Sequence, residues 1–349
     1  MIVIGTSAGG VEALRSLCRG LPADLPAAVF MVLHIAPEGG SILPELLSRA
    51  GPLPAVHPPA DGEGVRFERG RIYVAPPDRH MVIEGDRVRA VMSAKENRHR
   101  PAADPLFRSA ARHHGPHVVG VVLTGALDDG AAGLAAIKRQ GGLAVVQDPE
   151  DALFPSMPRT AMQHVAVDHS VSLAEMPALL ARLASDDLEH APLGVPEALE
   201  VETRITTMNR PEPEDVARIG RPSMFTCPEC HGTLFEIDDD KLLRFRCHVG
   251  HAYTAEALAA DQSEALEATL WAAVRAFEER AELADRMAAR GRHDGRPDRA
   301  QIFSDRAALA RRRAGQVRAA LTPARENEPE PGSRVLAGRG QAGEAGGDR

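Results

Sequence analysis

Ser7 is the first residue whose surroundings suggest chemistry, because it lies in a glycine-rich turn near the N-terminus. Gly5 and Gly9 flank it as Gly-x-Ser-x-Gly, directly after the apolar segment 1–4 and just before a helical pattern that opens at Val11. Glycines on both sides permit the tight backbone that lifts a serine hydroxyl above the edge of a sheet. A serine in such a turn is often only a helix cap, so the turn alone does not establish a nucleophile.

The same turn is also a candidate phosphate cradle, since strand, glycine loop and helix form the nucleotide site of many α/β folds. Its glycines at positions 5, 9 and 10 match neither the dinucleotide nor the P-loop spacing, and no lysine follows. The second apolar segment, residues 28–33, ends in His34 and not in an acidic residue that would hold a ribose hydroxyl. We therefore favour a nucleophile at Ser7.

A serine nucleophile needs a base, and that base needs an orienting carboxylate. His34 follows the second apolar segment, and Asp128 and Asp129 follow the strongly apolar segment 118–124. The carboxyl ends of strands in a doubly wound sheet face one crevice, so these side chains are expected beside Ser7. A loop histidine or a turn aspartate is ordinary by itself, but the three together favour an acyl-transfer site.

Three of the four cysteines form a second cluster. Cys227 and Cys230 make a Cys-x-x-Cys pair, and after sixteen intervening residues Cys247 opens a Cys-x-x-x-His pair that ends at His251. Two short ligand pairs separated by a hairpin-length segment are typical of tetrahedral zinc sites. We predict a closed, structural zinc site resembling a zinc ribbon, with His248 as the alternative fourth ligand. A redox Cys-x-x-Cys is the competing interpretation, which the second pair disfavours.

The elements that must position these residues alternate between strand-like and helix-like segments over residues 1–185. Continuous apolar runs such as 143–147 lie between helical patterns, which favours an α/β fold with a doubly wound, mostly parallel sheet. Residues 71–91 indicate a small antiparallel excursion, and residues 165–167 a last short strand. This segment is predicted to be the catalytic domain.

The rest of the chain changes character. Prolines interrupt an acidic, weakly periodic stretch over 186–224, which predicts a linker before the zinc-ribbon-like module at 225–253. Residues 254–321 carry apolar stripes at helical spacing, broken by glycine and proline, so we expect a helical hairpin that is also a possible dimerisation surface. The tail at 322–349 has few apolar residues and is expected to be disordered.

Charge and hydropathy limit the classes of partner. The net charge is −8 and the isoelectric point about 6.0, which gives no support to nucleic-acid binding. The sequence holds no apolar run long enough to cross a bilayer and no signal peptide, so we expect a cytoplasmic protein without membrane insertion.

A series of motifs runs in order through residues 1–185, and together these motifs resemble the chemotaxis protein-glutamate methylesterases. Several motifs in series are more specific than any one of them. They are Ile4-Gly5-Thr6-Ser7-Ala8-Gly9-Gly10, Leu33-His34-Ile35-Ala36-Pro37, Tyr73-Val74-Ala75-Pro76 with His80-Met81, Asn97-Arg98-His99-Arg100-Pro101, Leu123-Thr124-Gly125 through Asp129-Gly130-Ala131-Ala132-Gly133, and Met157-Pro158-Arg159.

The resemblance implies an α/β esterase that hydrolyses γ-glutamyl methyl esters of chemoreceptors and can also deamidate receptor glutamines. By motif, Ser7 would be the nucleophile, His34 the general base and Asp129 the residue that orients it. The family's oxyanion donors, which are backbone amides, fall on Ala8 and Ala126, where Thr and Met are commoner side chains. No cofactor is expected for catalysis.

The resemblance also bears on regulation and partners. Family members typically carry an N-terminal receiver domain, whereas this sequence starts at the first catalytic strand, so we expect control from elsewhere. Chemoreceptors or receptor-like proteins are the expected partners, with a methyltransferase or another signalling protein as a further candidate. The basic residues Arg98, His99 and Arg100 would either meet acidic receptor helices or anchor their own loop through salt bridges.

Two other classes of function stay open at this point. One is a non-catalytic signalling adaptor that recruits a partner through the zinc module and the helices. The other is a serine esterase with an unrelated small substrate. The complete set of Ser7, His34 and Asp129 argues against the adaptor, whereas the sequence shows no pocket that would exclude small esters.

Overall fold

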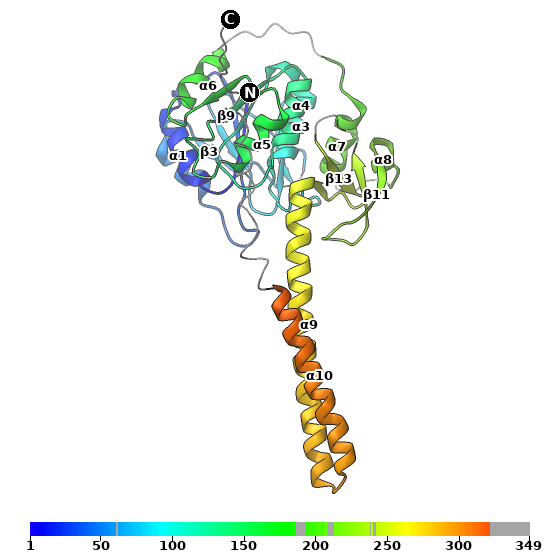
Figure 1. Ribbon diagram of the computed structural model, residues 1–349. Helices are drawn as coiled ribbons and strands as arrows, with labels where there is room; N and C mark the ends of the chain where they lie inside the picture. The colour runs from blue at the N-terminus through cyan, green and yellow to red at the C-terminus, as the bar shows by residue number, and fades with distance from the viewer. Residues whose placement is uncertain (61, 186–192, 209–212, 238, 240–241, 322–349) are drawn as a thin grey trace, which may run out of the picture. The chain divides into compact units, whose positions relative to one another are not determined.

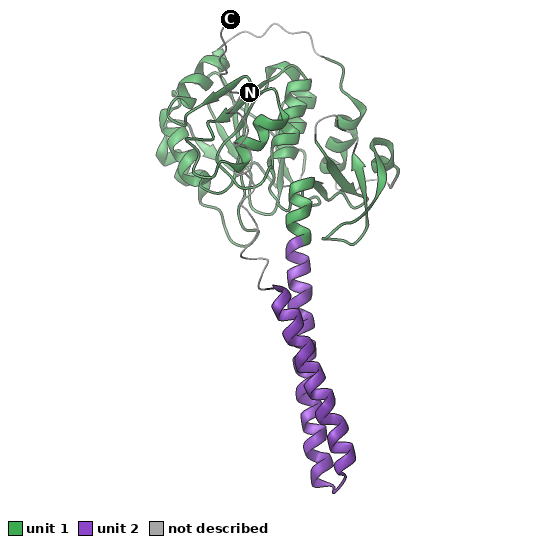
Figure 2. Cartoon of the chain, viewed as in Figure 1, with its two compact units in different colours: residues 1–262 green, residues 263–349 purple. Residues whose placement is uncertain are grey.

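The computed structural model describes the chain except for residues 61, 186–192, 209–212, 238, 240–241 and 322–349. The chain divides into two compact units, residues 1–262 and 263–349 (Figure 2). The first unit holds every residue that the sequence analysis selected for chemistry. The predicted disordered tail lies outside the described residues.

A seven-stranded sheet forms the centre of the first unit (Figure 1). The strand order is β10-β9-β8-β1-β2-β5-β3, and every neighbouring pair is parallel, which confirms the predicted α/β fold. Parallel strands that are buried on both faces have continuous apolar sequences, and the strands of this sheet follow that pattern. In chain order the strands are β1 (Ile2–Thr6), β2 (Val29–Leu33), β3 (Ala55–Val56), β5 (Ile72–Val74), β8 (Val119–Val122), β9 (Leu143–Gln147) and β10 (His169–Val171).

Helices cover both faces of this sheet, because alternate residues of each strand point to opposite sides. Ile2 and Ile4 of β1 pack into one apolar core, and Val3 packs into the other. The first core is closed by α1 (Gly10–Gly20), α2 (Leu43–Ala50) and α6 (Met176–Ser185). The second is closed by α3 (Ala103–His114), α4 (Ala131–Arg139) and α5 (Ser156–His164).

Two strand predictions need correction. The segment around β5 was expected in the antiparallel excursion, but β5 pairs in parallel with β2 and belongs to the main sheet. The separate antiparallel sheet consists of β4 (Val65–Arg66), β7 (Arg87–Val91) and β6 (His80–Glu84). The last strand begins at His169 instead of Val165, because Val165 caps the end of α5.

The described part of the predicted linker is not a plain connection. It forms α7 (Glu197–Met208), α8 (Pro213–Ile219) and β11 (Gly220–Thr226). Strand β11 opens a four-stranded antiparallel sheet with β12 (Thr233–Ile237), β13 (Arg244–Cys247) and β14 (Ala252–Thr254). The two helices are ordered by an apolar cluster shared with this sheet, made of Val201, Ile205, Val216, Ile219, Phe235 and Ile237.

The described part of the second unit consists of α9 (Ala255–His293) from Ser263 onward and of α10 (Pro297–Leu321). Its buried seam is built mainly from alanines: Ala281, Ala284, Ala288, Ala300, Ala307, Ala310 and Ala314. The larger apolar side chains Leu266, Ile302 and Leu309 of the same two helices are exposed. Ion pairs join Asp285 to Arg311 and Glu278 to Arg318. None of the described helices is long and apolar enough to span a membrane.

Candidate active site

Ser7 sits in the turn that connects β1 to α1. Its amide donates to the carbonyl oxygen of Thr124 at 3.1 Å, which ties the turn to the end of β8. Gly9 adopts a φ of 75° at the start of α1, a conformation that glycine reaches without the strain of a side chain. A Cβ on Gly10 would lie 2.5 Å from Leu33 Cδ1, so the turn also needs glycine for close packing.

His34 follows β2 and reaches across to the serine. Its Nδ1 lies 3.1 Å from Ser7 Oγ, and its Nε2 lies 2.7 Å from Asp129 Oδ2. An ionised carboxylate only accepts hydrogen bonds, so Nε2 carries the proton and Nδ1 presents its lone pair to the serine hydroxyl. The His34 side chain is 6% exposed and that of Asp129 2%, so the pair is largely shielded from water.

Asp129 lies on the loop before α4 and accepts several hydrogen bonds. The Ala103 amide donates to Oδ2 at 2.6 Å, and the Asn97 side-chain amide donates to Oδ1 at 3.0 Å. Burial raises the pKa of Asp129, but these bonds and the one from His34 outweigh it and hold the pKa well below the ordinary value. Asp129 is therefore the negative group that can orient and charge-balance His34.

Asp128, the other aspartate considered for this role, is placed differently. It is buried, and one of its carboxylate oxygens has no hydrogen-bond partner among the described residues. Burial raises the pKa of Asp128 to about 7, against which a hydrogen bond with Thr254 acts. Asp128 thus faces the start of α9, while Asp129 faces His34.

Two residues that the sequence analysis did not select, Asn97 and Asp104, complete the surroundings of Asp129. The side-chain amide of Asn97 donates to both carboxylates, at 2.8 Å to Asp104 and 3.0 Å to Asp129. Burial and the charge of Asp129 raise the pKa of Asp104. The sequence around Asn97 carries no signal for this bridge, because both carboxylates are brought to it by the fold.

The basic loop residues, expected either to meet receptor helices or to anchor their own loop, make contacts within the chain. Arg98 Nε donates to Asp261 at 3.0 Å, and Arg100 Nε donates to Asp78 at 2.9 Å. The ring of His99 stacks on the ring of His34, with centroids 3.8 Å apart and an interplanar angle of 18°. Burial, and then the neighbouring His34, lower the pKa of His99 to about 4. The arginines anchor the loop, and His99 covers the catalytic ring.

The loop after β8 also passes close to Ser7. A Cβ on Gly125 would lie 2.0 Å from Met157 Sδ and 3.0 Å from Ser7 Cβ. The Gly125 amide donates to Phe154 at 2.9 Å, which fixes the course of the loop just before Ala126. This close approach places the segment that leads to Ala126 beside the serine.

The four predicted metal-ligating residues lie together at one end of the second antiparallel sheet. Their ligand atoms all fall within 4.8 Å of one another, so this cluster could hold a metal ion. Cys230 Sγ is 3.6 Å from Cys247 Sγ, and His251 Nδ1 is 3.7 Å from Cys227 Sγ. These separations fit the edges of a tetrahedron around zinc, about 3.8 Å for sulfur ligands at their usual bond length. The exposed His248 instead packs edge-on against Phe235.

A serine, a histidine and a buried aspartate in hydrogen-bonded series at the carboxyl edge of a parallel sheet are the machinery of a serine hydrolase. The chain belongs to the CheB methylesterase family, whose model matches residues 2–180. The matched segment contains Ser7, His34 and Asp129 and ends before the cysteine cluster.

Two individual proteins and one solved structure show the similarity in more detail. A Leptospira interrogans protein, provisionally named a protein-glutamate methylesterase/protein-glutamine glutaminase, is 37% identical over 189 residues, which are 54% of this chain and 96% of that protein. An Anaeromyxobacter dehalogenans protein of the same name is 38% identical over 52% of this chain and 51% of its own length. The Thermotoga maritima CheB methylesterase catalytic domain aligns at 28% identity with a TM-score of 0.49, over 52% of this chain and 97% of that one.

Proposed function

We propose that residues 1–185 are a protein-glutamate methylesterase domain that hydrolyses γ-glutamyl methyl esters of chemoreceptors. The observation that carries the proposal is the hydrogen-bonded series from Ser7 Oγ through His34 to Asp129. Family membership narrows the chemistry from ester hydrolysis in general to methylesterase activity. The names of the relatives supply the substrate class, a modified glutamate of a protein.

In the proposed first half-reaction, Ser7 Oγ attacks the ester carbonyl carbon while His34 Nδ1 takes the hydroxyl proton. Asp129 holds the ring through Nε2 and balances the positive charge that His34 acquires. The backbone amides of Ala8 and Ala126 are assigned to the developing oxyanion. The carbon–oxygen bond of the ester then breaks, and methanol leaves with the proton from His34.

In the second half-reaction, water attacks the glutamyl ester on Ser7 and His34 takes its proton. Collapse of the intermediate releases the receptor glutamate and returns the proton to Ser7 Oγ. The same sequence applied to a receptor glutamine releases ammonia in place of methanol, which accounts for the second activity in the relatives' names. No step needs a cofactor.

We further propose that Cys227, Cys230, Cys247 and His251 hold a structural zinc ion. Four protein ligands leave no open coordination position for substrate, so the site is structural and not catalytic. Zinc stoichiometry measured under reducing conditions tests this directly, with one zinc per chain expected. A value near zero would refute the metal site.

The substrate class is tested by comparing two glutamyl methyl esters with each other and with an unrelated ester. Methanol release is measured with a methylated receptor fragment and with free glutamate γ-methyl ester, and p-nitrophenol release with p-nitrophenyl acetate. We expect kcat/KM for the receptor fragment to be roughly a hundredfold or more above that for free glutamate γ-methyl ester, because binding energy from the rest of the receptor stabilises the transition state. Equal values would favour an unrelated esterase, and no release from any substrate would favour the adaptor.

A further inference from the structure

Asn97 links the catalytic aspartate to the C-terminal part of the first unit. Its side-chain amide nitrogen donates to Asp129 at 3.0 Å and to Asp104 at 2.8 Å. Its side-chain oxygen accepts the amide of Thr254 at 3.1 Å, and its own backbone amide donates to Ala252 at 2.8 Å. The side chain is buried, and both of its amide hydrogens are committed to carboxylates.

The two residues that hold Asn97 lie on the strand next to the cysteine cluster. Ala252 directly follows His251 and opens β14, which pairs with β13, the strand that ends in Cys247. The Cys247 amide donates to the His251 carbonyl at 3.0 Å, which closes the turn that carries these two ligands. This hydrogen bond and the pairing of β14 with β13 connect Ala252 and Thr254 directly to Cys247 and His251, two of the four residues of the cluster.

The neighbours of Asn97 make further contacts with the same C-terminal residues. Lys95 pairs with Glu229 at 2.6 Å, and its carbonyl accepts the Ala252 amide at 3.3 Å. Arg98 donates to Asp261. Four consecutive residues of this loop thus bond to residues 229–261, although more than 130 positions separate the two segments.

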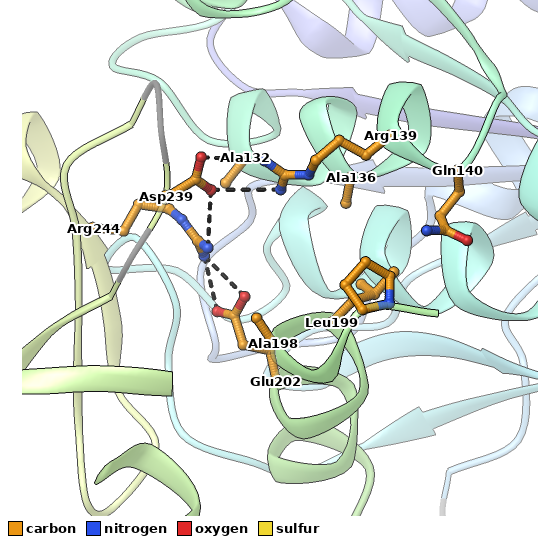
Figure 3. Close-up of a pocket in the computed structure, with 10 residues that line it drawn as sticks. Ala132, Ala136, Arg139, Gln140, Ala198, Leu199, Glu202, Asp239 and Arg244 are labelled. Atoms are coloured by element: carbon orange, nitrogen blue, oxygen red, sulfur yellow. Dashed lines mark hydrogen bonds and ion pairs between the residues drawn. The ribbon is translucent and has the colours of Figure 1, made fainter. Parts of the chain in front are cut away.

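The fourth contact is a buried ion cluster. Glu96 accepts from Arg108 of α3 at 2.6 Å and from Arg246 of β13 at 3.2 Å, all three side chains being at most 3% exposed. Arg246 also reaches Glu202 of α7 at 3.1 Å. Figure 3 shows the continuation of the cluster, in which Arg244 lies between Glu202 and Asp239.

The loop backbone explains why Asn97 needs such support. Asn97 and Arg98 have φ values of 48° and 73°, in the left-handed region that is unfavourable for most side chains. The Asn97 side-chain amide also bridges two neighbouring buried carboxyl groups, those of Asp104 and Asp129. A loop in this conformation keeps its geometry only when its surroundings hold it.

We infer that Asn97 is a positioning residue for Asp129 and that the Cys227/Cys230/Cys247/His251 metal site holds Asn97 through β14. The inference rests on the proposed function, since it concerns the turnover of the same triad. Loss of the metal releases β14, Asn97 then no longer fixes the Asp129 carboxylate, and His34 loses its orientation. Metal occupancy thereby controls an esterase site whose residues do not touch the metal.

The test is a double cycle of metal removal and the Asn97→Gly substitution in the full chain. Glycine removes the amide bridge and accepts the positive φ without strain. The inference predicts that zinc removal and Asn97→Gly each lower kcat by roughly 10- to 100-fold with little change in KM, because misplacing a catalytic group has costs of that order. Zinc removal from the Asn97→Gly variant should lower kcat no further.

A second readout does not depend on turnover. The proton shared by His34 Nε2 and Asp129 Oδ2 should give a downfield proton resonance in the zinc-loaded enzyme, which broadens or shifts upfield in both altered forms. Asp86→Asn is the control, since it removes an exposed ion pair with Arg66 and touches neither the Asn97 loop nor the cysteine cluster. It should leave the resonance and kcat unchanged.

The inference is overturned if zinc-free wild type keeps the resonance and a kcat within twofold of the zinc-loaded value. It is also overturned if zinc removal lowers the kcat of Asn97→Gly by the same factor as the kcat of wild type. Should zinc removal unfold the chain, zinc-loaded Asn97→Gly decides, since an unchanged resonance and kcat there would equally reject the role of Asn97. Absence of methanol release in every form would refute the proposed function alone, because the resonance still compares the four forms.

Discussion

At the scale of single residues, the orientation of His34 is the feature with the clearest chemical consequence. Its Nδ1 faces Ser7 and its Nε2 faces Asp129, whereas in Ser-His-Asp proteases Nε2 faces the serine. The roles of the two nitrogens are exchanged, yet the same logic holds, because the carboxylate fixes the tautomer that leaves a lone pair toward the nucleophile.

Substitution Asp129→Asn tests this assignment. The neutral amide neither balances the charge on His34 nor fixes its tautomer, so we expect kcat to fall roughly 10³- to 10⁴-fold with KM nearly unchanged. Asp128→Asn is the matched control, because Asp128 is also buried but does not contact His34. Comparable losses in the two variants, measured by methanol release, would mean that Asp129 has no special role.

At the scale of elements, the loop between β7 and α3 depends on a neutral histidine. The buried ring of His80 on β6 donates from Nε2 to the Ala94 carbonyl at 3.0 Å and accepts the Ala102 amide at Nδ1 at 3.2 Å. Burial lowers the pKa of His80 from 6.5 to about 4. The ring thus holds both ends of the segment that carries Asn97 and His99.

This histidine should make stability fall in mild acid. Between pH 6.5 and 4 the unfolded chain binds a proton that folded His80 does not, so unfolding becomes easier as the pH falls through that window. The expected contribution is up to about 3 kcal/mol. Urea unfolding at pH 7 and pH 4 should show that the free energy of unfolding falls more for wild type than for His80→Gln. The glutamine side chain can donate and accept hydrogen bonds but does not titrate. Equal losses would exclude His80 as the source.

At the scale of the whole molecule, the buried ion cluster connects α3, α7 and β13. It consists of Glu96, Glu202, Arg108, Arg244 and Arg246. Burial raises the pKa of Glu202, but Arg244, Arg108 and Arg246 outweigh it and keep it well below the ordinary value. Removing one partner from such a cluster leaves an uncompensated buried charge.

Substitution Arg246→Met should therefore destabilise the first unit by about 3–5 kcal/mol. Lys95→Met removes a partly exposed ion pair with Glu229 instead and should cost less than about 1 kcal/mol. Chemical denaturation of both variants at pH 7 measures the difference. A cost for Arg246→Met as small as that of Lys95→Met would show that the cluster contributes little to stability.

The limits of the sequence analysis follow from the same interactions. The parallel sheet could be predicted from the continuous apolar segments, because strands of a parallel sheet are covered by helices on both faces. The role of Asn97 could not be predicted, since its partners Asp129 and Thr254 are 32 and 157 positions away. Helix α7 lies in the predicted linker, and the side chains that order it include Glu202, whose charge is balanced by the sequence-distant Arg244 and Arg246.

The central claim is that Ser7 forms the acyl-enzyme, and the most direct measurement is methanol release from a methylated receptor fragment by wild type and by Ser7→Ala. Alanine removes only the hydroxyl, so folding and zinc content should match wild type and serve as controls. We predict that the variant loses roughly 10⁴-fold or more of the wild-type rate. Equal rates of methanol release from the two proteins would contradict the account.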